Sequence, residues 1–131
     1  MRLLLDTHVA IWAITDDARL TPKARALIEA PANAVVVSVA SVWEITIKYA
    51  QARGRVTDMQ VPAADALGYF RGAGFEILPI SPEHVLEVAN LPAHLNDPFD
   101  RLLIAQANIE TLRLLTSDRQ VVSYGGGVML I

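Results

Sequence analysis

The sequence predicts a three-layer α/β domain built on a parallel sheet. Short runs of aliphatic residues typical of buried strands alternate with segments whose apolar residues recur at helical spacing. A helix between two such strands is the crossover that parallel pairing requires. The 131 residues, 53% of them hydrophobic, are enough for a full core, and we expect one domain over residues 1–131. The expected strands are residues 2–5, 34–37, 75–79, 112–115 and 128–131.

The first elements have clear local signals. Residues 2–5 are a short aliphatic run, and apolar residues at helical spacing then predict a helix over 7–14. The Thr21–Pro22 pair supplies an N-cap and a first-turn proline for a helix that runs to about residue 30. Residues 34–37 are rich in β-branched side chains, which favour a strand.

The middle and end of the chain repeat this alternation. An amphipathic helix is expected over 38–52, and another over 62–73 with Gly74 at its end. Ser81–Pro82 and Asp97–Pro98 are further cap and first-turn pairs, so each is expected to open a helix. The helix after Asp97 is so apolar that it must pack on a broad face. Glycines 125–127 predict a turn before the last strand.

Composition excludes several classes of protein. With no cysteine, the chain has no disulfide framework, zinc–thiolate site or thiol nucleophile. Fourteen acidic against eleven basic residues give a net charge of −3, which argues against a strongly basic nucleic-acid binder. No apolar run reaches the length of a membrane span, and no leader precedes the first strand, so we expect a cytoplasmic protein that does not enter a membrane.

Four acidic residues are expected to meet at one edge of the sheet. Asp6 and Asp118 each follow a strand, and Glu44 lies near the start of the helix after the second strand. Asp100 lies in the first turn of the helix that begins after Asp97. Ligands of parallel sheets collect beyond the carboxyl ends of the strands. Carboxylates about 4 Å apart repel by roughly 4 kcal/mol at an effective dielectric of 20, and hard oxygen ligands suit Mg²⁺ or Mn²⁺.

Each acid also has a purely structural interpretation. Ser41 and Glu44 have the spacing of a capping box, in which the acid accepts from a backbone donor at the helix start. Asp6 has the position of a helix cap, and Asp118 that of a turn residue. Asp97, three residues before Asp100, suits a cap and also an outer ligand of the metal.

Taken together, the chain resembles the PIN-domain toxins of the VapC type. The resemblance covers the chain in order and is carried by Leu-Leu-Leu-Asp6-Thr7-His8, Ser41-Val-Trp-Glu44-Ile, Asp97-Pro-Phe-Asp100-Arg-Leu-Leu-Ile-Ala-Gln-Ala and Thr116-Ser117-Asp118. It implies a sheet of about five strands flanked by helices, and a Mg²⁺- or Mn²⁺-dependent endoribonuclease held inactive by an antitoxin. The family's catalytic and metal-binding acids then fall on Asp6, Glu44, Asp100 and Asp118. Supporting roles fall on Thr7, Asp97 and a hydroxyl residue, Thr116 or Ser117.

The resemblance predicts hydrolysis of RNA by a metal-activated water, which leaves 5′-phosphate and 3′-hydroxyl ends. Basic residues that would hold the RNA backbone are Lys48, Arg53, Arg55, Arg101 and Arg119. Arg101 is equally suited to be a structural partner of Asp97. The alternative function is a catalytically silent PIN-like module that binds RNA or protein.

The remaining aromatic and imidazole side chains have simpler interpretations. His8, His84 and His94 share no metal-ligand spacing and are interpreted as helix-end or loop residues. Trp12 and Trp43 have helical core spacing, which suits packing or dimer contacts, and stacking on a base is the alternative. The high apolar content predicts a homodimer, and a groove for an antitoxin segment on the helices that contain these two tryptophans.

Overall fold

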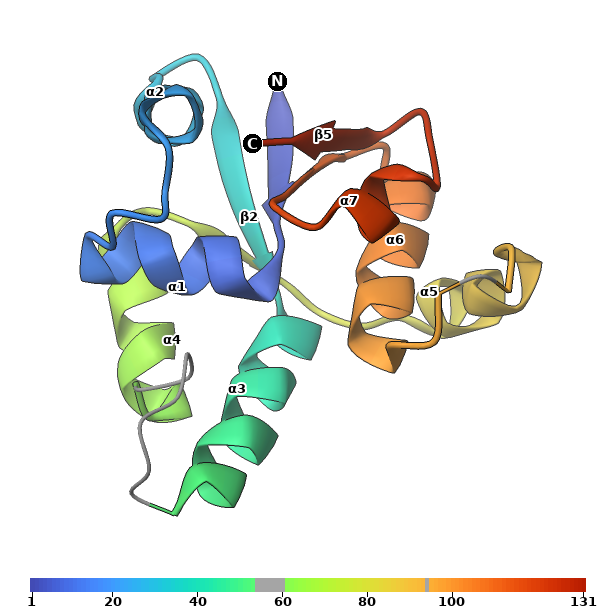
Figure 1. Ribbon diagram of the computed structural model, residues 1–131, viewed down its shortest axis with the longest axis horizontal. Helices are drawn as coiled ribbons and strands as arrows, with labels where there is room; N and C mark the ends of the chain where they lie inside the picture. Colours follow the sequence, from blue (N-terminus) through green and yellow to red (C-terminus); the bar gives the residue numbers. More distant parts are fainter. Residues whose placement is uncertain (54–60, 94) are drawn as a thin grey trace.

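The computed structural model describes residues 1–53, 61–93 and 95–131, and it confirms the predicted α/β architecture. The strands are β1 (Arg2–Leu5), β2 (Ala34–Ser38), β3 (Glu76–Leu78), β4 (Arg113–Thr116) and β5 (Val128–Leu130). The helices are α1 (Thr7–Thr15), α2 (Pro22–Glu29), α3 (Val39–Ala52), α4 (Ala63–Gly72), α5 (Pro82–Glu87), the 3₁₀ turn η1 (Val88–Asn90), α6 (Pro98–Glu110) and α7 (Arg119–Val122). Figure 1 shows how the helices surround the strands.

The five strands form one parallel sheet in the order β3-β2-β1-β4-β5. Both faces of the sheet are apolar because alternate side chains of a strand point to opposite sides. Leu3 and Leu5 belong to one core cluster, whereas Leu4 belongs to another. The first cluster includes Phe70 of α4, and the second includes Leu103 of α6. The sheet is therefore the middle of three layers, as the sequence predicts.

Several element ends differ from the prediction by a residue, and three differences are larger or of another kind. The third strand is shorter than 75–79, and the helix that begins at Pro82 passes into a 3₁₀ turn after Glu87. The helix α7 was not predicted, since four residues carry too little periodicity to be recognised. Gly74 does lie just past α4 with a φ of 82°, a conformation that glycine adopts without strain.

No helix within the described ranges has both the length and the apolar character needed to cross a membrane.

Candidate active site

The predicted acids lie at the carboxyl edge of the sheet because the strands are parallel. Asp6 directly follows β1, and Asp118 follows β4 by one residue. Glu44 reaches this edge from α3, the helix that leaves β2, and Asp100 lies in the first turn of α6. We call Asp6, Glu44, Asp97, Asp100 and Asp118 the acidic edge.

Asp100 has the electrostatic environment that the sequence predicts for this cluster. Burial raises the pKa of its carboxyl group, and repulsion from Asp6, Asp97, Glu44 and Asp118 raises it further, to about 8. The four predicted acids therefore come together, with Asp97 as a fifth. At neutral pH the metal-free protein relieves the repulsion by keeping a proton on Asp100.

Asp6 is buried and fixed by hydrogen bonds. It caps α1 by accepting from the backbone N–H of His8 at 3.4 Å, and its Oδ2 accepts from the Thr116 hydroxyl at 2.7 Å. Burial raises the pKa of Asp6, although the hydrogen bond from Thr116 and the charge of His8 act in the opposite direction. The cap interpretation of Asp6 is thus confirmed, and Oδ1 is the oxygen that accepts the longer bond from the N–H of His8.

Glu44 is not part of a capping box. The helix α3 begins at Val39, with Ser38 as its N-cap accepting from the N–H of Ala40 at 2.9 Å. Glu44 therefore lies in the second turn, where its side chain is 5% exposed and its Oε2 accepts from Lys48 Nζ at 2.6 Å. The predicted capping box was wrong because the polar residue at the strand end, three positions before Ser41, takes the cap.

Asp97 and Asp118 both cap helices. Asp97 accepts from the N–H groups of Phe99 and Asp100, at 2.9 and 3.2 Å, which confirms the cap interpretation. Asp118 accepts from the N–H of Gln120 at 2.9 Å and begins α7. Each carboxylate thus fixes the start of a helix that borders the acidic edge.

Two buried hydroxyl contacts connect the segments that carry the acids. Thr116 donates to Asp6 and also accepts from the N–H of Asp118 at 3.0 Å, so it links these two acids. The hydroxyl of Thr7 donates to the Ser41 hydroxyl at 2.8 Å, which ties the start of α1 to the start of α3. The sequence left the supporting hydroxyl open between Thr116 and Ser117, and only Thr116 makes this contact, since Ser117 is exposed.

Arg101 does not pair with Asp97. Its guanidinium donates to the carbonyl oxygens of Val88, Pro92 and Leu95 and to the Tyr124 hydroxyl, over distances of 2.8 to 3.2 Å. The predicted pairing was therefore wrong. Arg101 instead holds the segment between α5 and α6 against the end of the chain, and this engagement counts against its predicted role in holding RNA.

The other basic residues predicted to bind RNA differ in how exposed they are. Arg53 and Arg119 are exposed, at the end of α3 and the start of α7. Lys48 contacts Glu44, as described above. Arg55 lies outside the described residues.

The histidines and tryptophans largely follow their simpler interpretations. His84 is buried and forms a capping box with Ser81, while its Nε2 lies 3.1 Å from Glu110 Oε2. Trp12 is buried in the core, but Trp43 is 54% exposed and makes an edge-to-face contact with Phe99. Trp43 therefore lies outside the core, and its expected role as a dimer contact stays a prediction. His94 lies outside the described residues.

The acidic edge fits a divalent cation by its donor chemistry. In the part of the chain that the structure describes, no three His, Asp or Glu side chains are already arranged around a common metal position. One oxygen of Glu44 is taken by Lys48 and one of Asp6 by Thr116. The donors are nevertheless hard oxygens, and the proton held by Asp100 marks an excess of negative charge that Mg²⁺ or Mn²⁺ would neutralise.

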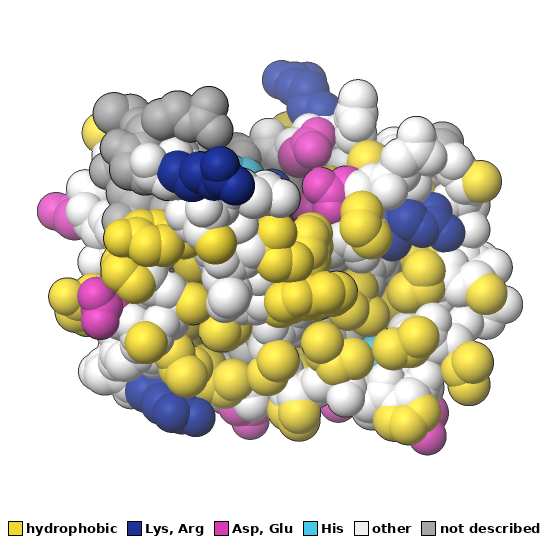
Figure 2. Space-filling model, turned by 90° about the horizontal axis from the view of Figure 1, so that it is seen from below, with side chains coloured by type: hydrophobic (Ala, Val, Ile, Leu, Met, Phe, Trp, Pro, Cys, Tyr) yellow, Lys and Arg dark blue, Asp and Glu magenta, His cyan; other side chains and the backbone are white. Residues whose placement is uncertain are grey.

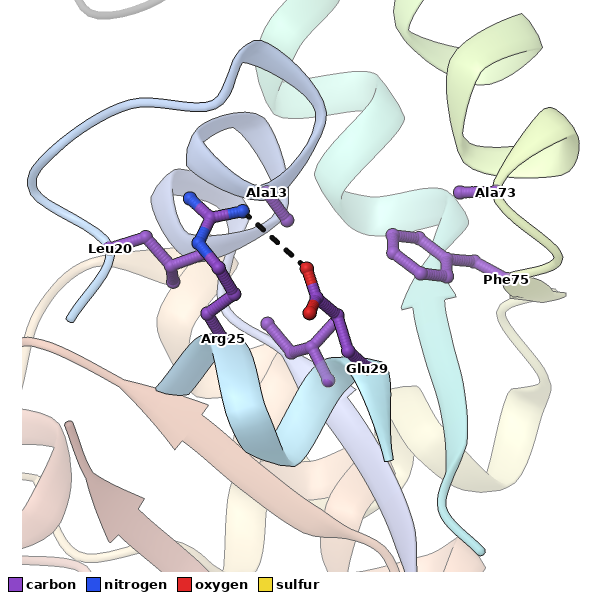
Figure 3. Close-up of a pocket in the computed structure, with 7 residues that line it drawn as sticks. Ala13, Leu20, Arg25, Glu29, Ala73 and Phe75 are labelled. Atoms are coloured by element: carbon purple, nitrogen blue, oxygen red, sulfur yellow. Dashed lines mark ion pairs between the residues drawn. The ribbon is translucent and has the colours of Figure 1, made fainter. Parts of the chain in front are cut away.

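A pocket of about 310 Å³ lies elsewhere on the molecule (Figure 3). Five of its seven lining residues are apolar, and the other two, Arg25 and Glu29 of α2, form a charged pair. The lining residues are Ala13, Leu20, Arg25, Ile28, Glu29, Ala73 and Phe75. Because Ala73 and Phe75 precede β3, this pocket lies toward the amino ends of the strands, away from the acidic edge.

The fold and the site define a parallel α/β protein with an acidic site beyond the carboxyl ends of its strands. A family comparison agrees with this class, since the PIN domain model matches residues 3–126. The chain therefore belongs to the PIN domain family. No curated protein matches it.

Several solved structures share the fold at low sequence identity. One is a chain of VapBC2 from Rickettsia felis, whose structure contains a DNA fragment from the promoter. It is 17% identical to this chain with a TM-score of 0.71, and the match covers 100% of this chain and 98% of the other. A chain of DNA-bound VapBC from Salmonella typhimurium is 14% identical with a TM-score of 0.65, covering 100% and 97%. A chain of a toxin–antitoxin complex from Klebsiella pneumoniae is 22% identical with a TM-score of 0.61, covering 97% and 95%.

Proposed function

We propose that this protein is a divalent-metal-dependent endoribonuclease that acts as the toxin of a toxin–antitoxin pair. The observation that carries the proposal is the convergence of four carboxylates on Asp100, whose pKa rises to about 8. Membership of the PIN family supports a nuclease. The likeness of the fold to chains of toxin–antitoxin complexes supports the toxin role.

Asp6, Glu44, Asp100 and Asp118 would hold Mg²⁺ or Mn²⁺. When bound, such an ion would polarise the scissile phosphate and lower the pKa of a water molecule, so that hydrolysis leaves 5′-phosphate and 3′-hydroxyl ends. Thr116 keeps Asp6 in place, and the cap bonds of Asp97 keep the first turn of α6, and with it Asp100, in position.

Basic residues at the end of α3 and the start of α7 would bind the RNA backbone. Arg53 and Arg119 are exposed and free to approach a polyanion, and Arg55 is proposed by its sequence position alone. Binding of this kind depends on phosphate contacts, so the affinity for RNA should fall steeply as salt rises.

The antitoxin is proposed to place an apolar segment in the pocket of Figure 3. Leu20, Ile28 and Phe75 supply apolar contacts there, and Arg25 supplies a charge at the rim. The sequence predicts this groove on the helices that contain Trp12 and Trp43. The pocket involves the first of these, through Ala13, but no residue of α3 lines it.

A homodimer is proposed from the exposed apolar surface. Figure 2 shows hydrophobic side chains over much of the face seen from below, where α3 and α4 lie in Figure 1. Exposed large hydrophobic residues on these helices are Val39, Trp43, Tyr49 and Tyr69. Patches of this kind mark interfaces.

Sedimentation equilibrium tests the homodimer. At micromolar concentration the protein should give twice the chain mass, and a monomer at that concentration would rule out the dimer.

RNA cleavage by the purified protein tests the proposed activity. With Mn²⁺ or Mg²⁺ the wild type should cleave RNA to fragments with 5′-phosphate ends. Asp6→Asn and Asp100→Asn should lower the rate by about two orders of magnitude or more, because a lost ligand removes several kcal/mol of charge stabilisation. Asp65→Asn, the same change at an exposed acid of α4, is the matched control and should cleave normally.

Growth of cells that express each variant gives an independent measurement. The wild type and Asp65→Asn should arrest growth, whereas Asp6→Asn should not. If Asp6→Asn cleaves RNA and arrests growth like the wild type, the catalytic proposal is wrong, and a binding module without catalysis becomes the better account.

A further inference from the structure

Lys48 places a positive charge inside the acidic edge. Its Nζ lies 2.6 Å from Glu44 Oε2, one helical turn away on α3. The Glu44 side chain is 5% exposed and that of Lys48 is 37% exposed, so the carboxylate is the buried partner and the ammonium the partly exposed one. A buried carboxylate is costly unless it is paired, and Lys48 supplies that pairing.

The influence of Lys48 extends beyond Glu44. Burial lowers the pKa of Lys48, but the hydrogen bond and charge of Glu44, with the charges of Asp97 and Asp100, outweigh it and raise the pKa above its ordinary value. The ammonium therefore faces acids from two elements, α3 and the start of α6. A divalent cation held by Glu44 and Asp100 would enter the same electrostatic field.

We propose that Lys48 is an internal counter-cation that neutralises Glu44 in the metal-free protein and has to release it when a divalent ion binds. This inference rests on the proposed function, because it assumes that the acidic edge binds a metal ion. It goes beyond the role of Lys48 as a contact for RNA. On this account Lys48 lowers the affinity for the metal and stabilises the protein in its absence.

The direction of the effect follows from the charges. Metal binding carries two penalties. It has to break the ion pair between Lys48 and Glu44, and it brings the divalent ion close to the Lys48 ammonium, which repels it. A neutral side chain at position 48 removes both penalties, so the metal should bind more tightly. The same change leaves Glu44 buried without a counter-ion, so the metal-free protein should be less stable.

Titration calorimetry with Mn²⁺, without RNA, tests the inference. Lys48→Met should bind Mn²⁺ about tenfold more tightly than the wild type, which corresponds to about 1.4 kcal/mol. Lys48→Arg keeps the charge and should stay within about threefold of the wild type. Lys23→Met removes a charge from an exposed position on α2 and controls for the change in net charge, so its affinity should not change.

Thermal unfolding gives a second readout that does not depend on activity. Without metal, Lys48→Met should melt below the wild type, and saturating Mn²⁺ should raise its melting temperature by more than it raises that of the wild type. If Lys48→Met does not fold, Lys48→Gln takes its place as the neutral variant, because its amide can still donate to Glu44.

The outcomes separate this inference from the proposed function. If the wild type binds Mn²⁺ and the neutral variant binds it equally or more weakly, the counter-cation inference is overturned while the metal site stands. If neither the wild type nor the neutral variant binds Mn²⁺, both are overturned. Tighter binding by the neutral variant, with Lys48→Arg and Lys23→Met close to the wild type, supports the inference.

Discussion

Asp100 shows most clearly what the acidic edge does to a single residue. Burial and repulsion from four other carboxylates raise its pKa to about 8, so this acid is protonated in the metal-free protein at neutral pH. A divalent ion that binds there has to displace the proton. Metal affinity should therefore increase with pH up to about pH 8.

The stability of the metal-free protein should fall as pH rises through the same range. The folded protein holds the Asp100 proton up to about pH 8, whereas the unfolded chain loses it near the ordinary value of 3.8. Between these values the folded state binds more protons, so the free energy of unfolding decreases with pH. The slope from this group is at most about 1.4 kcal/mol per pH unit.

Urea unfolding of the metal-free protein at pH 5, 6, 7 and 8 measures this dependence. The variant Asp100→Asn should show a shallower loss of stability with pH than the wild type, because its amide does not titrate. Asp65→Asn serves again as the exposed control and should follow the wild type. Parallel curves for Asp100→Asn and the wild type would show that the raised pKa is wrong.

Sequence alone predicted which acids meet but not how they are held. Asp6 and Asp118 were predictable because parallel strands bring their carboxyl ends to one edge. The contacts of Thr7 with Ser41 and of Lys48 with Glu44 were missed. The Glu-to-Lys spacing of four residues was a usable signal for the second contact. The first depends on how two helices lie relative to each other, which spacing along the chain does not reveal.

At the scale of elements, Arg101 fixes the connection between α5 and α6. Its side chain joins the carbonyl oxygens of Val88, Pro92 and Leu95 to the Tyr124 hydroxyl. Pro92 and Leu95 lie outside the helices and strands, so their carbonyl oxygens depend on partners such as Arg101, whereas the Val88 oxygen also accepts from the N–H of Leu91 at 3.2 Å. The helix α6 begins immediately after this connection and carries Asp100, so its position depends on the same contacts.

Arg101→Ala should lower the free energy of unfolding by about 2–4 kcal/mol, because several hydrogen bonds to a charged group are lost together. Arg101→Lys should restore only part of this loss, since a single ammonium cannot replace the fork of the guanidinium. Arg113→Ala removes an exposed arginine of β4 and should change stability by no more than about 0.5 kcal/mol. Urea unfolding of the three variants checks this, and a loss below 1 kcal/mol for Arg101→Ala would contradict the assigned role.

The order of helices and strands was predictable from the sequence, whereas their first and last residues were predicted less accurately. Cap and proline pairs at Thr21, Ser81 and Asp97 each opened a helix, because that local chemistry favours only one helix start. The capping box at Ser41 failed because Ser38 lies nearer the strand and competes for the same role. Choosing between two such candidates requires the strand end, which tertiary pairing with β3 extends to Ser38.

At the scale of the whole molecule, the parallel sheet separates two kinds of surface. The acidic edge lies at the carboxyl ends of the strands, and the pocket lined by Leu20 and Phe75 lies toward their amino ends. This separation supports the proposed function, in which substrate binds at one end of the sheet and an antitoxin segment at the other. Both faces of the sheet are filled by the core, so neither competes for these functions.

A crystal grown in millimolar Mn²⁺ and measured for anomalous scattering tests the central claim most directly. We expect a strong anomalous peak at the acidic edge, with carboxylate oxygens of Asp6 and Asp100 about 2.0–2.6 Å from it. Loss of that peak in Asp100→Asn would assign it to this cluster. A map with no peak there, or with Mn²⁺ bound only elsewhere, would contradict the account.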